Sequence, residues 1–345
     1  MTCGLNTESH KFRIRLAKLA AAVGIYAGLA LFLYQPHLKK FESLQYIVVI
    51  CTYLAALGCF VLSRRWVGSF IGSFFAGAVY GFGPLSLWLS GYHPTVSLLV
   101  AAIPWLLCPA AWCSKKKWWT GIPLSALPFL AILLAFQIAA HYRLFPIPIH
   151  TRLRAADLVG LFAPLVALER SMPLVGFYHV SIAALLLGLS MLLKARRLGI
   201  LLILVTGVIL AFFGPLFNIS PIIWLTIPIL CCSVVIGAGL QGLALAGFTD
   251  RKWLLMITGI MTALAITALL LATKYHNVFA GFGTKYANLL TQTAKLYLLG
   301  AIATGIIFFM ARAKLRLTAL RWFILSLAMA ADILYCASFI AYRVL

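Results

Sequence analysis

The chain alternates long apolar segments with short polar connections along its whole length. A helix that crosses the hydrocarbon core of a bilayer needs about 20 predominantly apolar residues. We predict spans at about residues 16–34, 44–62, 67–89, 94–113, 119–140, 174–193, 198–217, 222–248, 253–273, 287–311 and 319–341. The pattern therefore predicts an all-α, polytopic helical membrane protein with about 11 transmembrane helices, in which residues 1–345 form a single integral-membrane domain.

The longest connection, residues 141–173, contains an apolar piece that is too short to cross the bilayer. This piece reads ADLVGLFAPLVALER, and its apolar part lies between Asp157 and Glu169. Such a length is typical of a helix that lies in the interface or re-enters the membrane, with its charged ends among the headgroups. We therefore predict one outer interfacial or re-entrant helix here.

Small residues recur at helical spacing in two of the predicted spans. Serines and glycines occupy every fourth position from Ser69 to Gly81. The sequence GAGLQG, from Gly237 to Gly242, spells the dinucleotide-binding fingerprint, but no strand precedes it and it lies inside a predicted span. Both stretches are typical of faces where membrane helices pack closely, and we predict packing rather than nucleotide binding.

The composition excludes a water-soluble core. Hydrophobic residues make up 64% of the chain, charged residues make up 10%, and the mean hydropathy is +1.05, whereas soluble domains have about 25% charged residues. The chain has 28 Lys and Arg against 6 Asp and Glu, a formal net charge of +22. In a soluble protein this excess would suggest nucleic acid. Because these cations lie in short loops between spans, membrane topology and anionic lipid headgroups explain them better, and we expect no nucleic-acid partner.

The basic clusters also predict an orientation. With the N-terminus in the cytoplasm, every strongly basic cluster falls on the cytoplasmic side, as the positive-inside rule requires, and the long connection at residues 141–173, with four cations, is the one outer exception. These clusters are Arg64–Arg65, Lys115–Lys117, residues 194–197, residues 250–252 and residues 312–321. We therefore predict a multi-pass protein of a bacterial inner (cytoplasmic) membrane.

The remaining ionisable side chains concentrate on the predicted outer face. His37, His93, His179, Asp157 and Glu169 map to outer connections or to the outer ends of spans. We consider these five residues a candidate outer-face polar cluster.

Two stretches resemble a known architecture. They are SFIGSFFAGAVYGFGPLSLWLSGYHPTVSLLVAAIPWLL, and VGFYHVSIAALLLGLSMLLKARR with the later ILAFFGPLF and GAGLQGLALAG. In these stretches the chain resembles the membrane module of the GT-C superfamily, especially its bacterial YfhO-like branch. The likeness covers about residues 16–250, so residues 251–345 would add three C-terminal spans or part-spans. Members transfer sugars from polyprenyl-phosphate donors, and their first outer loop is long and carries a catalytic acid. Here that loop is QPHLKKFES, so the module is predicted to be degenerate.

Sugar transfer of that type needs an outer carboxylate as general base and cations that hold the lipid-linked phosphate. Glu42 is the single acid in the first outer loop and is the candidate catalytic base. The candidate cations for a lipid phosphate or headgroup are Lys39, Lys40, Arg143, Arg152 and Arg154. The alternative is that Glu42 only offsets the two adjacent lysines at the headgroup boundary.

Asp332 lies midway along the last predicted span. An acid inside the membrane is a functional candidate by default, and we expect it to face a partner helix of this chain or of another subunit. Lys295 lies near the outer end of its span and is expected to reach the interface by snorkelling.

Cofactor chemistry receives little support from the sequence. The eight cysteines form no CxxC pair, and we interpret them as packing residues rather than as a metal site or disulfide framework. His93 and His179 are possible ligands of a b-type haem, although His93 can equally cap a helix. We expect no metal and no cofactor, apart from a polyprenyl-phosphate sugar if the chain is an enzyme.

Three functional hypotheses follow. The first is a non-catalytic, GT-C-like subunit that docks partner proteins and lipid in a larger inner-membrane complex. The second is a polyprenyl-phosphate-sugar-dependent glycosyltransferase acting on the outer face. The third is a redox-chain membrane subunit with haem or quinone sites.

Overall fold

A computed structural model describes residues 3–38, 45–92, 94–113, 118–142, 153, 155–170, 172–194, 198–213, 219–278, 283–315 and 317–344. These residues form helices and turns, with no strand among them. The helices of 12 or more residues are α1 (Cys3–Tyr34), α2 (Tyr46–Ser63), α3 (Phe70–Gly81), α5 (Pro94–Cys113), α6 (Trp118–Tyr142), α9 (His179–Lys194), α10 (Leu198–Phe212), α12 (Thr226–Leu245), α13 (Arg251–Val278), α14 (Gly283–Arg312) and α15 (Thr318–Val344). The shorter ones are α4 (Pro84–Tyr92), η2 (Ala155–Leu158), α7 (Val159–Phe162), α8 (Pro164–Glu169), α11 (Pro221–Trp224) and η4 (Phe248–Asp250).

The helices have the length and composition of a multi-pass membrane protein. Within the described part of the chain, nine helical segments are long and apolar enough to cross a membrane. The predicted sixth and seventh spans appear as the shorter apolar helices α9 and α10. The polytopic helical class is thus confirmed, while the total of eleven spans stays a prediction.

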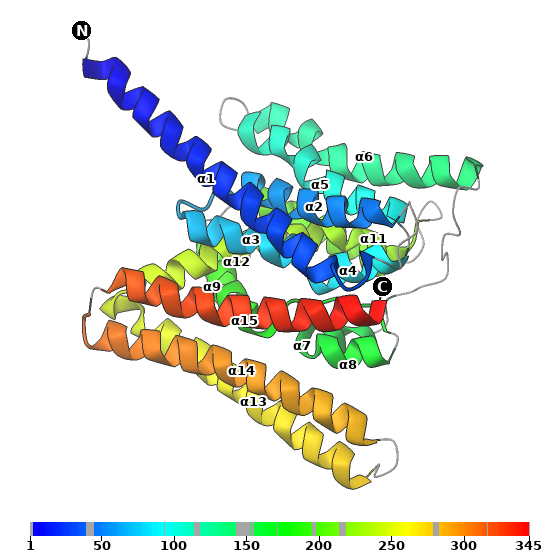
Figure 1. Ribbon diagram of the computed structural model, residues 1–345, viewed down its shortest axis with the longest axis vertical. Helices are drawn as coiled ribbons and strands as arrows, with labels where there is room; N and C mark the ends of the chain where they lie inside the picture. The colour runs from blue at the N-terminus through cyan, green and yellow to red at the C-terminus, as the bar shows by residue number, and fades with distance from the viewer. Residues whose placement is uncertain are drawn as a thin grey trace.

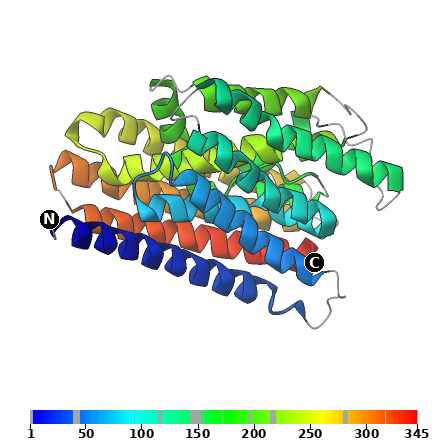
Figure 2. The same ribbon diagram turned by 90° about the horizontal axis from the view of Figure 1, so that it is seen from above.

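Two spans form the centre of the molecule. In the span Pro221–Leu245, which holds α11 and α12, 89% of the most apolar window is buried, and in Phe70–Gly91, which holds α3 and α4, 83% is buried. Helix α15 lies between this centre and the hairpin formed by α13 and α14 (Figure 1). Seen from above, α1 follows α15 along one side of the molecule (Figure 2).

Glycines bring the central helices into close contact, as the sequence predicted. A Cβ atom on Gly72 of α3 would lie 2.7 Å from the carbonyl oxygen of Gly237 of α12, and the reverse distance is also 2.7 Å. A Cβ on Gly239 would collide with the Ala184 carbonyl oxygen of α9. The Gly237–Gly242 motif is therefore a packing face.

The third predicted span contains a break that the hydrophobic pattern did not reveal. Helix α3 ends at Gly81 and α4 begins at Pro84. Pro84 has no N–H to donate to the turn before it. The hydroxyl of Ser86 donates instead to the Tyr80 carbonyl at 2.6 Å. The backbone is thus satisfied inside the protein, as a break at membrane depth requires.

The predicted re-entrant helix and the start of the sixth span also differ from expectation. Residues 155–169 form three short pieces, η2, α7 and α8, instead of one helix. Residues 172–178 are not helical, so α9 begins at His179, later than the predicted residue 174. Gly176 and Gly160 cross so closely that a Cβ on Gly176 would collide with the Gly160 carbonyl oxygen. This close crossing packs the non-helical segment 172–178 against α7.

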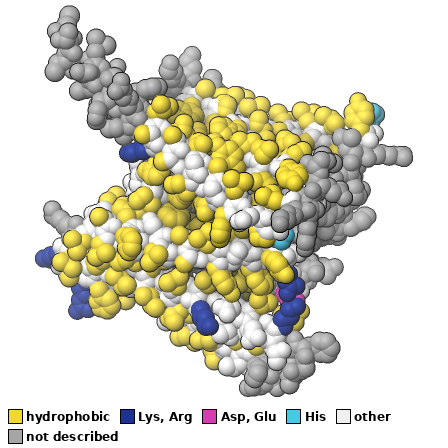
Figure 3. All heavy atoms as spheres, viewed as in Figure 1, with side chains coloured by type: hydrophobic (Ala, Val, Ile, Leu, Met, Phe, Trp, Pro, Cys, Tyr) yellow, Lys and Arg dark blue, Asp and Glu magenta, His cyan; other side chains and the backbone are white. Residues whose placement is uncertain are grey.

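Contacts between helix ends agree with the prediction that successive connections lie alternately at two opposite ends of the bundle. At one end, the Arg65 side chain donates to the Ala111 carbonyl at 3.0 Å, and Lys314 and Arg251 both lie over the Phe248 ring. These residues belong to, or adjoin, four of the predicted cytoplasmic clusters. Hydrophobic side chains cover most of the face between the two ends that Figure 3 shows.

At the opposite end, residues of the predicted outer connections meet. Glu169 is paired with Lys285 and Arg343, and His37 lies against the Tyr342 ring. The two predicted faces of the membrane therefore correspond to two separate ends of the helix bundle. Which end faces the cytoplasm stays a prediction.

Candidate functional site

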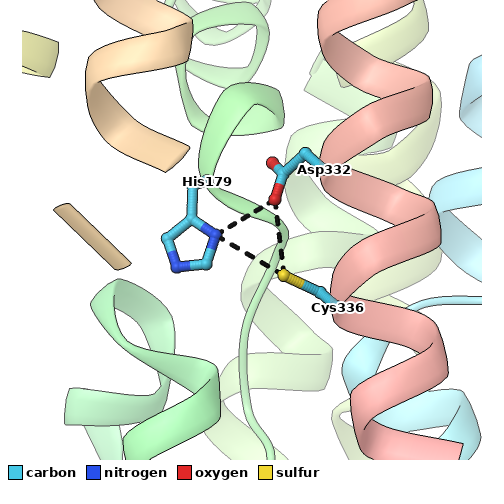
Figure 4. A group of neighbouring side chains, drawn as sticks. All are labelled: His179, Asp332 and Cys336. Carbon is cyan, nitrogen blue, oxygen red and sulfur yellow. Dashed lines mark hydrogen bonds and ion pairs between the residues drawn. The ribbon is translucent and has the colours of Figure 1, made fainter. Parts of the chain in front are cut away.

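The intramembrane acid lies in a small, fully buried polar group. Asp332 projects from the middle of α15, Cys336 follows one turn later, and His179 is the first residue of α9 (Figure 4). The three side chains have no exposed surface. The His179 Nδ1 atom lies 3.1 Å from Asp332 Oδ1, and the Cys336 thiol donates to the same oxygen at 3.4 Å. The Cys336 Sγ atom is 3.8 Å from His179 Nδ1.

Asp332 also caps a helix that begins inside the protein. The backbone N–H of Val180 donates to Asp332 Oδ2 at 2.6 Å. The first N–H groups of a helix have no partner within it, and in a membrane protein water is not at hand to replace one. A carboxylate at this position also interacts favourably with the positive end of the helix dipole. Asp332 thus has an internal partner, which is one of the two alternatives that the sequence left open.

The breaks described above converge on this group. The hydroxyl of Tyr178, the residue before His179, donates to the carbonyl of Phe82 at the α3–α4 break. The hydroxyl of Tyr297 on α14 donates to the carbonyl of Phe162 at the α7–α8 break, at 2.7 Å. The Tyr297 ring also packs edge-to-face with the His179 ring, with centroids 4.9 Å apart.

The hydrogen bonds satisfy the polar atoms of Asp332 and Cys336 but leave one imidazole nitrogen of His179 without a partner in the described part of the protein. Asp332 accepts from a backbone N–H and a thiol, and its carboxylate faces one imidazole nitrogen, so it is satisfied although it has no access to water. The other imidazole nitrogen, His179 Nε2, has no hydrogen-bond partner in the described part of the protein. It points away from Asp332 and Cys336 (Figure 4).

The end of the bundle that carries His37 holds a second charged group. Glu169 Oε1 lies 2.5 Å from Lys285 Nζ, and Glu169 Oε2 lies 2.9 Å from Arg343 Nη2. The neighbouring Arg170 guanidinium lies 5.3 Å from the centre of the Tyr286 ring. These contacts join α8, α14 and α15 where they meet.

The structure separates the residues that the sequence assigned to one outer cluster. His37 and Glu169 do lie at the same end of the bundle, and Asp157 is buried in η2. His179, which was expected at the outer end of a span, lies instead beside the midpoint of α15. It reaches that depth because residues 172–178, which are not helical, enter the protein before the helix begins.

Seven candidate residues of the glycosyltransferase and haem hypotheses lie outside the described part of the chain, namely Lys39, Lys40, Glu42, His93, Arg143, Arg152 and Arg154. Their roles as base, phosphate ligands or haem ligand stay predictions. Lys295 is exposed on α14, as snorkelling requires, whereas Arg321, which belongs to the predicted cytoplasmic cluster at residues 312–321, is buried.

Sequence reasoning missed three residues of the buried group: Tyr178, Tyr297 and Cys336. Cys336 was interpreted as a packing residue, but its spacing of four from Asp332 on one helix was a usable signal, because such residues share a face. Tyr178 adjoins His179 in the sequence, yet its bond to Phe82 joins residues that are 96 positions apart.

A second feature is an apolar cavity near the end of the bundle that carries Arg65. It has a volume of about 610 Å³ and lies among α2, α5, α6, α10 and α12. Its walls are almost wholly apolar and include Leu62, Leu107 and Leu230, with Ser125 adding a hydroxyl. Ile122 of α6 and Leu202 of α10 line it and are exposed, so the cavity opens to the lipid-facing surface along these helices.

No family model, curated protein or solved structure matches this chain. The GT-C resemblance therefore stays a prediction. Conclusions about function depend on the contacts, burial and charges of the two features above.

Proposed function

We propose that the protein is a non-catalytic membrane subunit that binds lipid and docks partner proteins in a larger assembly. In this proposal the chain is a GT-C-like helical module of a bacterial inner membrane, with about eleven spans and a cytoplasmic N-terminus. The observation that carries the proposal is the apolar cavity among α2, α5, α6, α10 and α12.

The chemistry of the cavity fits a lipid hydrocarbon chain. Its volume lies in the range of ordinary small-molecule sites. A lipid tail that moves from the bilayer into the cavity leaves surroundings that are already apolar, so the hydrophobic effect adds little to the free energy of binding. Binding must therefore depend on close packing in the cavity and on contacts of the headgroup. Arg65 contacts Ala111, which lines the cavity, and thus supplies a positive charge beside it. An anionic phospholipid is therefore the proposed occupant.

The ionisable side chains support a non-catalytic role. Asp332 caps α9, Glu169 joins three helices, and Arg321 donates to the Ala246 carbonyl beyond the end of α12. Each of these groups already has a structural partner. A general base, by contrast, must be within reach of the substrate proton that it abstracts.

Filling the cavity tests the lipid half of the proposal. Gly199 lines the cavity, and a Cβ there would have no atom within 4 Å, so Gly199→Leu should narrow the cavity or its opening without disturbing the fold. Native mass spectrometry in mild detergent should then show less bound phospholipid than in the wild type. Gly259→Leu is the matched control, since Gly259 on α13 is equally unobstructed and lies outside the cavity. Unchanged lipid in Gly199→Leu would contradict the proposed site.

Co-purification tests the assembly half. The proposal expects a stoichiometric set of other proteins to accompany the chain from its native membrane in mild detergent. A lone chain with bound lipid phosphate would favour the glycosyltransferase hypothesis. In that case Glu42→Gln should abolish sugar transfer, whereas a non-catalytic subunit should assemble normally with this substitution. A Soret band in the purified protein would favour the redox-subunit hypothesis instead.

A further inference from the structure

We infer that His179, Asp332 and Cys336 form a binding site for a divalent transition-metal ion, and that Zn²⁺ is the ion they fit best. The site lies between α9 and α15 and is independent of the lipid cavity and of any partner protein. The inference depends on three observations: the distances between the ligand atoms, the identity of the ligands and their total charge.

The distances between the ligand atoms match those around an ion with tetrahedral coordination. Zinc binds histidine nitrogen and carboxylate oxygen at about 2.0 to 2.2 Å and thiolate at about 2.3 Å, so ligands of one tetrahedron lie roughly 3.3 to 3.6 Å apart. The three distances in the protein are 3.1 Å for nitrogen to oxygen, 3.4 Å for sulfur to oxygen and 3.8 Å for sulfur to nitrogen. An ion can therefore enter with shifts of a few tenths of an ångström.

The backbone holds the ligands in place. Asp332 and Cys336 are four residues apart and share one face of α15, and His179 is fixed at the first position of α9. The second carboxylate oxygen of Asp332 accepts the Val180 N–H, which orients the first oxygen toward the thiol and the imidazole. Such outer hydrogen bonds are typical of metal-binding carboxylates. The three side chains point toward one another (Figure 4).

Charge favours a divalent ion at this depth. A neutral imidazole, a carboxylate and a thiolate together carry two negative charges, which a divalent cation cancels. Binding releases the thiol proton of Cys336 and requires the imidazole tautomer that carries its proton on Nε2, so that Nδ1 can bind the ion. The loaded site is then neutral, whereas the ion-free site with a neutral imidazole buries one unbalanced negative charge, which is costly in an apolar interior.

The combination of ligands narrows the choice of ion. Thiolate and imidazole select zinc and its neighbours in the first transition series over magnesium and calcium, which prefer oxygen. Three protein ligands leave one tetrahedral position that no fourth His, Cys, Asp or Glu of the described chain supplies.

Metal analysis of the tag-free full chain in detergent tests the inference. After treatment with a chelator and reloading with Zn²⁺, the wild type should retain about one zinc ion per chain after gel filtration. Cobalt loading should produce a thiolate-to-metal charge-transfer band in the near ultraviolet. Cys336→Ser keeps a hydroxyl for Asp332 but lacks the thiolate, so its zinc affinity should fall at least roughly tenfold and the cobalt band should vanish. Cys59→Ser, another fully buried cysteine, should behave as the wild type.

Two results would overturn the inference. One is a well-folded wild type that retains no zinc after reloading, in which case the three residues are a hydrogen-bonded group only. The other is equal zinc binding by Cys336→Ser and the wild type, which would place the ion elsewhere. His179→Gln, which also removes a ligand, keeps the inference testable if Cys336→Ser fails to fold. Neither result would affect the lipid measurement on Gly199→Leu.

Discussion

The carboxylate of Asp332 accepts the backbone N–H of Val180 at 2.6 Å, so a residue of α15 caps the first turn of α9 although Val180 lies 152 positions earlier in the chain. Helix caps in soluble proteins are usually local, because the N-cap residue is adjacent in sequence. Here the residue before α9 is Tyr178, whose hydroxyl is bound to Phe82. The cap is therefore supplied by another helix, and it ties the last span to the centre of the molecule.

This relationship predicts that Asp332 contributes to stability. Asp332→Ala leaves the Val180 N–H without its acceptor and the His179 imidazole without its partner, so the free energy of unfolding should fall by about 2 to 4 kcal/mol. Asp332→Asn retains one acceptor oxygen and should lose less. Unfolding in detergent followed by circular dichroism would measure both.

Asp250→Ala provides the matched control for the Asp332 variants. Asp250 also accepts a backbone N–H, from Gly247 at 3.0 Å, but this contact is exposed. The loss should therefore stay near or below about 1 kcal/mol. Equal losses for Asp332→Ala and Asp250→Ala would show that the buried cap has no special importance.

The glycine contacts predict opposite effects for the same substitution at two positions. Gly237→Ala places a methyl group 2.7 Å from the Gly72 carbonyl oxygen, and backbone at that distance cannot give way easily, so we expect a loss of about 1 to 3 kcal/mol. Gly259→Ala meets open space, so it should be neutral or stabilising by up to about 1 kcal/mol, because alanine favours helix. Thermal unfolding in detergent would compare them. A stabilising Gly237→Ala would contradict the close packing of α3 and α12.

Arg321, in the first turn of α15, is expected to make a further contribution to stability. Its guanidinium donates to the Ala246 carbonyl, just past the last turn of α12, and to the Leu315 carbonyl at 2.8 Å. Arg321→Met keeps the apolar stem but leaves these carbonyls without their donors, and unfolding should become easier by about 1.5 to 3 kcal/mol. The exposed Arg312 serves as control, since Arg312→Met should change stability by less than about 0.5 kcal/mol. Similar values for the two variants would mean that Arg321 is not a structural cap.

The sequence predicted the helical class well because one-dimensional patterns determine it. Apolar length placed most spans within a few residues of their helices, and the small residues of α3 and of α12 were each recognised as a packing face, although not as partners of one another. The break at Pro84 was less predictable, because membrane helices tolerate proline wherever another group satisfies the backbone. Here Ser86 provides that group.

The candidate site was only half predictable for a related reason. Asp332 was visible as an acid within an apolar span, and Cys336 is on the same helix face. Their partner His179 depends on where α9 begins, and that depends on the crossing of Gly160 and Gly176. No local sequence pattern predicts such a crossing, so the sequence alone led to the prediction that His179 lies at the outer end of its span.

The orientation of the chain is open to a direct test with two cysteine reporters at opposite ends of the bundle. Cys113 is naturally exposed at the end of α5, beside the helix end that carries Arg65. Gln35, just after α1, is exposed and lies near the end that carries His37. If the N-terminus is cytoplasmic, a membrane-impermeant maleimide should label Gln35→Cys in intact spheroplasts. The same reagent should reach Cys113 only after the membrane is opened.

Background labelling in this test depends on how far the other cysteines are buried. Cys3→Ser removes the N-terminal thiol, and Cys113→Ser is added when Gln35→Cys is the reporter. Cys51, Cys59, Cys231 and Cys336 are buried and should stay unlabelled in the folded protein. Labelling of Cys113 from outside would reverse the orientation and place the basic clusters against the positive-inside rule. Labelling of both reporters from the same side would contradict the alternation of spans, because α1 and α5 would then not end on opposite faces.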